Sequence, residues 1–403
     1  MIRTLHMEKL QEQVMAKLDL SREIEDGELV ELIYQVLEEY TKDKYIPLRM
    51  KMEFGRDLFN AFRKLDILQE LLEDESITEI MINGLENIFV EKGGEIYQYE
   101  KRFVSRKKRE DIAQQIASGC NRTVNEAEPI VDARLPDGSR VNLVLPPVAL
   151  NGPIITIRKF PKEGITMKRL IAWGSISKEA AEFLEKLVKA KYNMFISGGT
   201  GSGKTTFLNA LSQFIPEDER IITIEDNAEL KLQSLPNLVR LEARNANMEG
   251  EGEIDIRELI RTALRMRPDR VIVGEVRSAE TIDMLQAMNT GHDGSLSTGH
   301  GNSPKDMIGR LETMVLMGME IPIEAVQRQI ASGIDIIIHL GRMRDKTRKV
   351  LEILEITGYE EGRIQMHTLY EFQEKGSSHG KVRGSLVKKE ELQKKEKLLA
   401  AGY

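Results

Sequence analysis

Cysteine and long apolar runs are both scarce in this chain of 403 residues. Cys120 is its one cysteine, which excludes an internal disulfide framework and is typical of a reducing compartment. No apolar run approaches the roughly 20 residues that span a bilayer, and the region after Met1 is too polar for a secretory signal peptide. We therefore expect a cytoplasmic protein that serves a membrane, if at all, from its inner face and through partner proteins.

Aromatic residues and net positive charge are lacking as well. Aromatic residues make up 5% of the chain, Trp173 is its one tryptophan, and the formal net charge is −7. Nucleic-acid-binding surfaces need basic grooves and stacking aromatics, so this composition argues against one. Hydrophobic residues at 41% over this length can build the cores of two or three domains.

The first half of the chain has two different patterns. Residues 1–73 are predicted to form a helical bundle or arm, because apolar residues recur there at helical spacing. Residues 74–160 are predicted to form an α+β domain with an antiparallel sheet. Its hairpin turns are expected at Gly93-Gly94 and Asp137-Gly138. Residues 161–176 are expected to be a linker.

The second half alternates between strand and helix, as a parallel sheet requires. We predict an α/β domain over residues 177–372. Its strands are expected at 193–197, 221–225, 238–242, 270–274 and 294–298, with closing strands at 334–338, 350–357 and 363–370. Basic residues outnumber acidic ones in residues 373–403. We expect this segment to be a charged, flexible tail with a short helix from Ser385.

One stretch organises the second domain. A predicted strand runs into GGTGSGKT at residues 198–205, which matches G-x-x-x-x-G-K-[ST] and opens a helix. Glycines let successive N–H groups turn into one hollow, and the helix adds its positive end, so an anionic phosphate is held there. We call this segment the phosphate loop. The residues expected to bind the nucleotide are Gly198, Gly199, Thr200, Gly201, Ser202, Gly203, Lys204, Thr205 and Thr206.

Phosphoryl transfer to water also needs a metal ion, a positioned water and positive charge on the developing oxygens. Lys204 is expected to reach the outer phosphates, and the Thr205 hydroxyl to bind Mg²⁺. Glu225 and Asp226 close one predicted strand, and Glu275 follows another. The carboxyl ends of parallel strands meet at one edge, so we favour function over simple helix capping for these acids.

Two further groups of residues are candidates. His292 and His300 lie in one glycine-rich stretch, where phosphate sensing is favoured over metal binding because their spacing suits no common zinc site. Arg140 and Arg158, and less securely Arg134, belong to the preceding α+β domain. An arginine that completes a site from outside the core domain is an arginine finger.

Together these segments resemble the secretion ATPase superfamily of type II secretion, type IV pili and type IV secretion. The resemblance is strongest to the tight-adherence (Tad/Cpa, Flp pilus) assembly ATPases. It rests on GGTGSGKTT at 198–206, TIED at 223–226, RTALRMRPDRVIVGEVR at 261–277 and LQAMNTGHDGSLSTGH at 285–300. It implies a RecA-like phosphate-loop ATPase domain after an α+β, PAS-like domain and a helical N-terminal extension.

The resemblance also implies roles. Glu225 would orient or deprotonate the attacking water, and Glu275 would be the Walker B acid that assists Mg²⁺ and water. His292 and His300 would form the histidine box, and Arg140 and Arg158 would be the amino-domain arginines. Such ATPases form hexameric rings with ATP and Mg²⁺ between two domains and a neighbouring subunit.

The leading hypothesis is therefore a Mg²⁺-dependent, hexameric ATPase motor that drives assembly of a tight-adherence pilus through a membrane platform protein. A type IV secretion ATPase that moves protein or DNA is the alternative within enzymes. A RecA-like nucleic-acid motor is a second, and the acidic composition argues against it. A scaffold that binds ATP only to order a ring is a third, and the presence of Glu225, Glu275 and His300 together argues against that.

Overall fold

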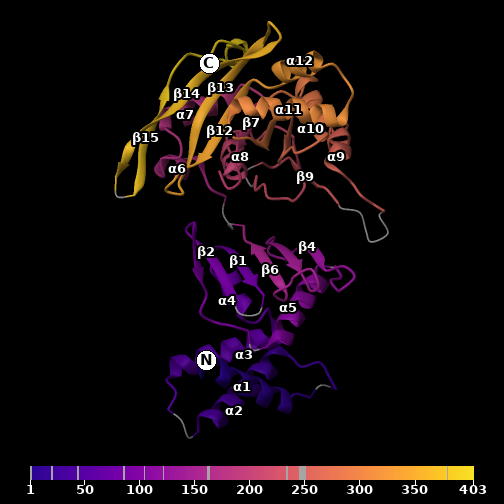
Figure 1. Cartoon of the computed structure of the whole chain (residues 1–403), viewed down its shortest axis with the longest axis vertical. Coiled ribbons are helices and arrows are strands. Elements are labelled where there is room, and N and C mark those ends of the chain that lie inside the picture. The colour runs from indigo at the N-terminus through magenta and orange to yellow at the C-terminus, as the bar shows by residue number, and fades with distance from the viewer. Residues whose placement is uncertain are drawn as a thin grey trace. The chain divides into compact units, whose positions relative to one another are not determined.

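The computed structural model of the chain divides into two compact units, Met1–Lys162 and Glu163–Tyr403 (Figure 1). It describes residues 2–19, 21–42, 45–84, 87–103, 105–120, 122–160, 164–232, 235–244, 251–378 and 380–403. Each unit has hydrophobic cores of its own. Among the described residues, no helix is long and apolar enough to cross a membrane.

The first unit begins with a three-helix arrangement. Its helices are α1 (Ile2–Lys17), α2 (Asp26–Thr41) and α3 (Leu48–Arg63). Their apolar faces meet in one cluster around Leu10, Ile33 and Leu58, each almost fully buried. Burial of these three stripes against each other supplies the stability that isolated helices of this length lack.

A six-stranded antiparallel sheet follows in the same unit, with the strands in the order β3-β2-β1-β6-β5-β4. The strands are β1 (Ile77–Asn83), β2 (Asn87–Lys92), β3 (Glu95–Gln98), β4 (Ile130–Arg134), β5 (Arg140–Val144) and β6 (Ile154–Arg158). Helix α5 (Arg106–Gly119) starts at Ser105, whose hydroxyl accepts a hydrogen bond from the Lys108 N–H. Leu68 and Leu71 of α4 (Ile67–Glu73) pack into the core of this sheet. The sheet's core therefore begins before residue 74.

The second unit is built on a nine-stranded sheet in the order β15-β14-β13-β12-β7-β11-β10-β8-β9. Strands β12 to β9 in that order are parallel, and β13 to β15 add an antiparallel extension. The parallel strands are β7 (Met194–Gly198), β8 (Ile221–Glu225), β9 (Leu238–Glu242), β10 (Arg270–Val273), β11 (Leu296–His300) and β12 (Ile336–Arg342). The extension comprises β13 (Arg348–Glu360), β14 (Arg363–Ser378) and β15 (Lys381–Lys388).

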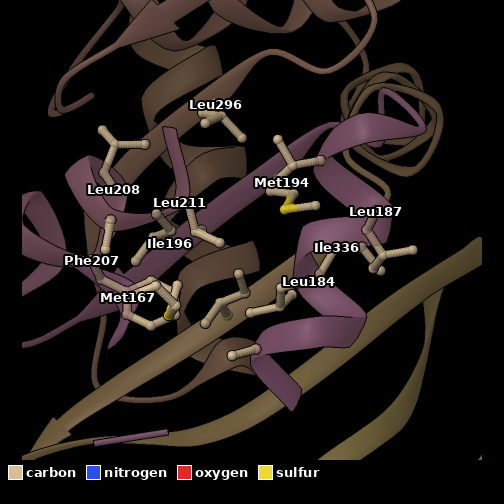
Figure 2. Packing of buried hydrophobic residues seen from close by; sticks show 14 of the residues in the cluster. Met167, Leu184, Leu187, Met194, Ile196, Phe207, Leu208, Leu211, Leu296 and Ile336 are labelled. Atoms are coloured by element: carbon tan, nitrogen blue, oxygen red, sulfur yellow. The ribbon is translucent and has the colours of Figure 1, made fainter. Parts of the chain in front are cut away.

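Helices cover both faces of the parallel part. Residues of α6 (Met167–Ala172), α7 (Lys178–Lys189) and α8 (Lys204–Ser212) share one core with the sheet, which Figure 2 shows around Ile196, Leu208 and Leu211. The other face packs against α9 (Ile256–Ala263), α10 (Glu280–Asn289), α11 (Pro304–Gly318) and α12 (Ile323–Gly333). Central strands buried on both faces read as continuous apolar runs, which is why the sequence pattern located them.

The predicted linker is partly helical. Met167 and Leu170 of α6 are buried in the second unit's core, and Thr166 caps that helix by accepting from the Arg169 N–H. Residues 161–163 lie outside the described residues. The expectation of a linker through residue 176 is therefore corrected, because the apolar side of this short segment is buried.

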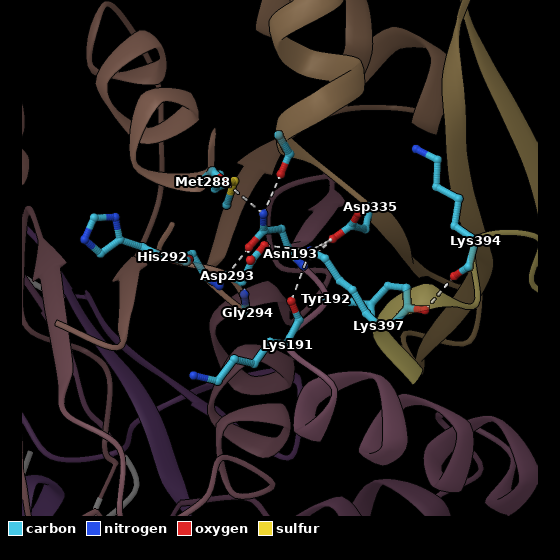
Figure 3. Close-up of polar contacts among 12 residues, drawn as sticks. Lys191, Tyr192, Asn193, Met288, His292, Asp293, Gly294, Asp335, Lys394 and Lys397 are labelled. Atoms are coloured by element: carbon cyan, nitrogen blue, oxygen red, sulfur yellow. Dashed lines mark hydrogen bonds and ion pairs between the residues drawn. The ribbon is translucent and has the colours of Figure 1, made fainter. Parts of the chain in front are cut away.

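The predicted flexible tail is also corrected. Residues 373–378 continue β14, and residues 381–388 form β15, so the chain is a strand at Ser385. The short helix expected in this segment begins later, as α13 (Glu396–Ala400). The chain end then docks on the amino-terminal edge of the sheet (Figure 3). The Lys397 ammonium lies 2.7 Å from Asp293 Oδ1 and 2.8 Å from Asp335 Oδ2, and the Tyr192 hydroxyl donates to the Lys394 carbonyl at 2.6 Å. Charge counting alone missed this contact because the partners are distant in sequence.

Lys397→Ala should therefore destabilise the second unit. It leaves the largely buried Asp335 carboxylate without its cation, a loss of about 1–3 kcal/mol in the free energy of unfolding. We expect the thermal unfolding midpoint to fall by several degrees. Lys395→Ala, which changes an exposed lysine beside it, is the matched control. Equal midpoints for the two variants would contradict the docking role of Lys397.

Candidate active site

The phosphate loop joins β7 to α8, as its glycines require. Gly203 caps α8 with a left-handed φ of 94°, and Gly201 has φ 70°. A Cβ on Gly198 would lie 2.5 Å from the Leu340 carbonyl oxygen and 2.6 Å from Ser202 Oγ, so a side chain cannot fit there. The result is an exposed turn at Gly199 and Thr200 over the N-terminus of α8, where an anion is stabilised.

Strand register brings the other candidates to this loop. His300 on β11 and Leu340 on β12 both stand opposite Gly198 on β7. Glu275 follows β10, the strand next to β11, and Glu225 ends β8 beyond it. All lie at the carboxyl edge of the parallel strands, which is where open α/β sheets bind ligands.

A chain of polar contacts starts at Lys204. Its buried ammonium lies 3.4 Å from the Gly199 carbonyl oxygen, 3.3 Å from His300 Nδ1 and 3.9 Å from Glu275 Oε1. His300 Nε2 lies 2.8 Å from the same Glu275 oxygen. Burial lowers the pKa of His300, and the nearby cations Lys204, Arg277 and Arg310 act in the same direction against Glu275. A neutral ring accepts a hydrogen bond from Lys204 at Nδ1. Glu275 Oε1 is close to Nε2 but is buried without a hydrogen-bond partner among the described residues.

Arg277 holds the second oxygen of Glu275. Its Nη2 and Nε donate to Glu275 Oε2 at 2.7 Å and 3.0 Å, and its Nη1 lies 3.4 Å from Asp226 Oδ2. Two N–H bonds to one carboxylate oxygen fix its orientation more firmly than a single bond does. The structure thus places Lys204, His300 and Glu275 in contact beside the phosphate loop, and Arg277 connects Asp226 to them.

Glu225 is buried with its two oxygens in different surroundings. Oε2 accepts hydrogen bonds from the N–H groups of Glu229 and Leu230 at 2.7 Å and 2.8 Å. Oε1 is buried and has no hydrogen-bond partner among the described residues. Burial raises the pKa of Glu225 to about 7, although the two N–H bonds oppose the shift. One oxygen therefore caps the loop after β8, while the other can exchange a proton near neutral pH.

The structure separates the two predicted histidines. β11 runs parallel to β7, so His292, which precedes β11, lies at the amino-terminal edge of the sheet. Its Nδ1 is 3.3 Å from the Ala287 carbonyl oxygen, and its ring points away from Asn193 (Figure 3). Five strand residues span roughly 16 Å, so within one chain His292 does not reach the phosphate loop. The expectation that both histidines sense phosphate is corrected for His292.

The predicted arginines form one row in the first unit. The register pairs Arg134 with Arg140 across β4 and β5, and Arg140 with Arg158 across β5 and β6. Residues directly opposite each other in antiparallel strands project to the same face. Val141 and Ile157, the neighbours in sequence, are buried on the other face. The three side chains therefore leave the sheet on the face opposite to Val141 and Ile157.

Three residues near the loop were missed by sequence reasoning. His339, buried on β12, lies 2.9 Å from Ser197 Oγ through Nδ1, and burial lowers its pKa. Arg348 Nε donates to the Gly201 carbonyl oxygen at 2.8 Å. Arg342 stands opposite Arg348 in the register of β12 and β13. The sequence pattern did predict a closing strand at 334–338. A strand that pairs in parallel with β7 ends next to the phosphate loop, so the residues after it were candidates for the site.

No group of three or more His, Cys, Asp or Glu side chains in the described part of the chain forms a metal site by itself. Mg²⁺ that binds together with a nucleotide takes most of its ligands from phosphate oxygens and water. Thr205, in the first turn of α8, carries a hydroxyl, and Glu275 carries a carboxylate oxygen without a hydrogen-bond partner among the described residues, and both are oxygen donors of the kind that Mg²⁺ binds. The donor set therefore fits Mg²⁺ carried by a phosphate chain.

Glu225 makes the stability of the fold depend on pH. Its raised pKa means that the folded state binds the proton more tightly than the unfolded state, so its contribution is complete below about pH 4.5 and is lost as pH rises through about 7. Glu225→Gln avoids this loss. We expect the variant to exceed the wild type by up to about 3 kcal/mol in unfolding free energy above pH 7, with the gap closing toward pH 5.

Denaturant unfolding at several pH values measures this gap, and Glu217→Gln, which changes an exposed glutamate, is the control. A gap that stays constant from pH 5 to 8 would show that Glu225 does not titrate in this range.

Comparisons with known proteins agree with this arrangement. A family model described as type II/IV secretion system protein matches residues 62–393. A Mycobacterium tuberculosis (strain CDC 1551 / Oshkosh) protein, provisionally named for conjugal transfer, is 36% identical over 310 residues, covering 75% of this chain and 87% of that protein. The type IV secretion system protein VirB11 of Brucella abortus biovar 1 (strain 9-941) is 31% identical, covering 68% and 84%.

Solved structures share the fold. The Legionella pneumophila ATPase DotB matches with a TM-score of 0.52 and 23% identity, over 72% of this chain and 80% of that one. The pilus retraction motor PilT with bound ADP matches with a TM-score of 0.52 and 20% identity, over 75% and 81%. The family match covers most of the chain, including the phosphate loop, Glu225 and Glu275. The chain therefore belongs to the type II/IV secretion system ATPase family.

Proposed function

We propose that the chain binds ATP with Mg²⁺ at the phosphate loop and hydrolyses it to drive a secretion or pilus machine. The observation that carries this proposal is the position of Lys204. Its ammonium is buried between His300 and Glu275 at the carboxyl edge of the sheet, where the outer phosphates of a nucleotide would lie. A cation held among neutral and anionic groups is ready to exchange them for phosphate oxygens.

The geometry divides the work among the side chains. Lys204 neutralises charge on the outer phosphates. Thr205 and Glu275 would hold Mg²⁺, which would lower the charge on the phosphates when bound. Glu225, with its pKa near 7 and a free oxygen, orients the attacking water or accepts its proton. His300 contacts both Lys204 and Glu275. A phosphate group that replaces His300 as the partner of Lys204 would therefore change the position of the histidine, which makes it a phosphate sensor.

We propose further that the arginine row of the first unit completes this site, in a hexameric ring at the inner face of the cell membrane. Arg140 and Arg158 stand together on one face of their sheet, which allows two guanidinium groups to meet one phosphate chain. Closure and opening of sites between domains would then move a membrane platform protein.

Two kinds of machine are candidates for what this ATPase drives: a type IV secretion system and a tight-adherence pilus. The names of the relatives, which refer to conjugal transfer and type IV secretion, support a type IV secretion ATPase with protein or DNA as cargo. The sequence resemblance at residues 285–318 supports assembly of a tight-adherence (Flp) pilus. Gene neighbourhood separates them: pilin and platform genes favour the pilus, and conjugation genes favour transfer.

Arg140→Ala and Lys204→Ala should fail in different ways. Without Lys204 the phosphate loop loses its cation, so ATP binding should be lost. Without Arg140 the binding of ATP should be nearly retained, while kcat falls by about 10³-fold or more, because an arginine finger acts on transition-state charge. ATP binding and Mg²⁺-dependent hydrolysis, measured on the full chain, separate the two effects.

Arg102→Ala, an exposed arginine of the same unit, is the matched control and should behave as the wild type. The wild type should also show activity per subunit that climbs with protein concentration and then levels off, as assembly requires. Full activity of Arg140→Ala would remove the first unit from the proposed mechanism, and absent wild-type hydrolysis would favour a scaffold.

A further inference from the structure

The hairpin between β12 and β13 reaches the phosphate loop from the side opposite the catalytic acids. β12 is the parallel neighbour of β7, with Leu340 opposite Gly198, whereas β11, β10 and β8 lie on the other side of β7. Beyond Gly198 the two chains diverge into the phosphate loop and the hairpin turn. The register pairs Arg342 with Arg348 at the base of that turn.

Contacts between the hairpin and the loop are direct. Arg348 Nε donates to the Gly201 carbonyl oxygen at 2.8 Å. Its side chain also covers Gly203, where a Cβ would come within 3.3 Å of Arg348 Cδ. A Cβ on Gly201 would lie 3.9 Å from Arg342 Nη1. Both arginine side chains therefore lie against the loop, and among the described residues Arg342 has no hydrogen-bond or ion-pair partner.

The bond from Arg348 fixes the direction of a peptide group. In a trans peptide the carbonyl and the following N–H point to opposite sides. With the Gly201 carbonyl held by Arg348, the Ser202 N–H points the other way, and it donates across the loop to the Gly199 carbonyl at 3.2 Å. This hydrogen bond closes the turn from Gly199 to Ser202, so the bond from Arg348 supports the folded shape of the loop. Glycine at 201 has no side chain to oppose rotation of this peptide, so an external hold is needed.

The hairpin turn is itself well anchored. The Met343 N–H donates to the Thr347 carbonyl at 2.7 Å, and Asp345 Oδ2 accepts from the Val382 N–H at 2.7 Å. Arg344 pairs with Glu374 of β14 at 2.8 Å through Nη1. The hairpin is thereby tied to β14 and β15, the strands that end the nine-stranded sheet. A fixed hairpin can hold a mobile glycine loop, whereas a loose one could not.

We propose that the β12–β13 hairpin is part of the nucleotide site, with Arg348 as a positioning residue that keeps the phosphate loop in its phosphate-accepting form. Arg342, beside it, supplies a second cation for the phosphate chain of a nucleoside di- or triphosphate. This inference rests on the proposed function and adds two residues of the same chain to it. Arg348 maintains the shape of the loop, and Arg342 supplies positive charge to the phosphate chain.

The test compares Arg348→Ala, Arg342→Ala and the matched control Lys346→Ala, which changes an exposed lysine in the turn of the same hairpin. Affinities for ATP and for ADP are measured by calorimetry on the full chain at two salt concentrations. Arg348→Ala should weaken the binding of both nucleotides about tenfold at either salt concentration, because both bind to the same shape of the loop. Arg342→Ala should weaken the binding of ATP more at low salt than at high salt, as the loss of an exposed charge does. Lys346→Ala should bind as the wild type.

Arg348→Lys separates positioning from charge. It keeps the charge but moves the donor beyond the Nε position, so it should restore little of the lost affinity. Recovery to wild-type affinity in Arg348→Lys would overturn the positioning role, as would equal affinities for Arg348→Ala and Lys346→Ala. If wild type binds ATP and Lys204→Ala does not, such a result rejects the hairpin's role and leaves the proposed function standing. If wild type binds no nucleotide, the proposed function fails instead.

Discussion

The parallel register of three neighbouring strands is the constraint on which the site depends. β12, β7 and β11 run side by side, and Leu340, Gly198 and His300 stand in one line across them. Because β7 and β11 end at that line and β12 ends two residues beyond it, the phosphate loop, the hairpin after β12 and the histidine of β11 lie at the same edge of the sheet. A shift of one residue would turn each of these side chains to the other face of the sheet. Buried apolar residues on both faces hold the register in place.

The charge of Lys204 is the second constraint on the site, after the strand register. Lys204 is a buried cation at the positive end of a helix, an arrangement that is unfavourable until anions or acceptors surround it. His300, Gly199 and Glu275 fill that need within the chain, and Arg277 in turn binds Glu275. A phosphate chain would satisfy Lys204 better than neutral acceptors do. The site therefore links nucleotide binding to the arrangement of the acid and the histidine through one lysine.

Much of this could be predicted from the sequence, and the failures have physical causes. The phosphate loop and the strand-end acids Asp226 and Glu275 follow from local rules about glycine turns and parallel strands, and the structure groups them. His292 was misplaced because similarity of loop composition says nothing about which edge of the sheet a loop occupies. The hairpin arginines and the docked chain end depend on strand order and on contacts between distant residues. The tight-adherence assignment and the catalytic roles remain proposals, since fold and family leave the machine open.

The most direct test of this account is ATP binding and turnover by Glu275→Gln in the presence of Mg²⁺. The amide keeps the size of the side chain and its contact with His300 but loses the negative charge opposite Lys204. The account predicts a chain that binds ATP about as well as the wild type and holds it unhydrolysed. Hydrolysis at the wild-type rate would contradict the central claim, because the acid held between His300 and Arg277 would then take no part in the chemistry.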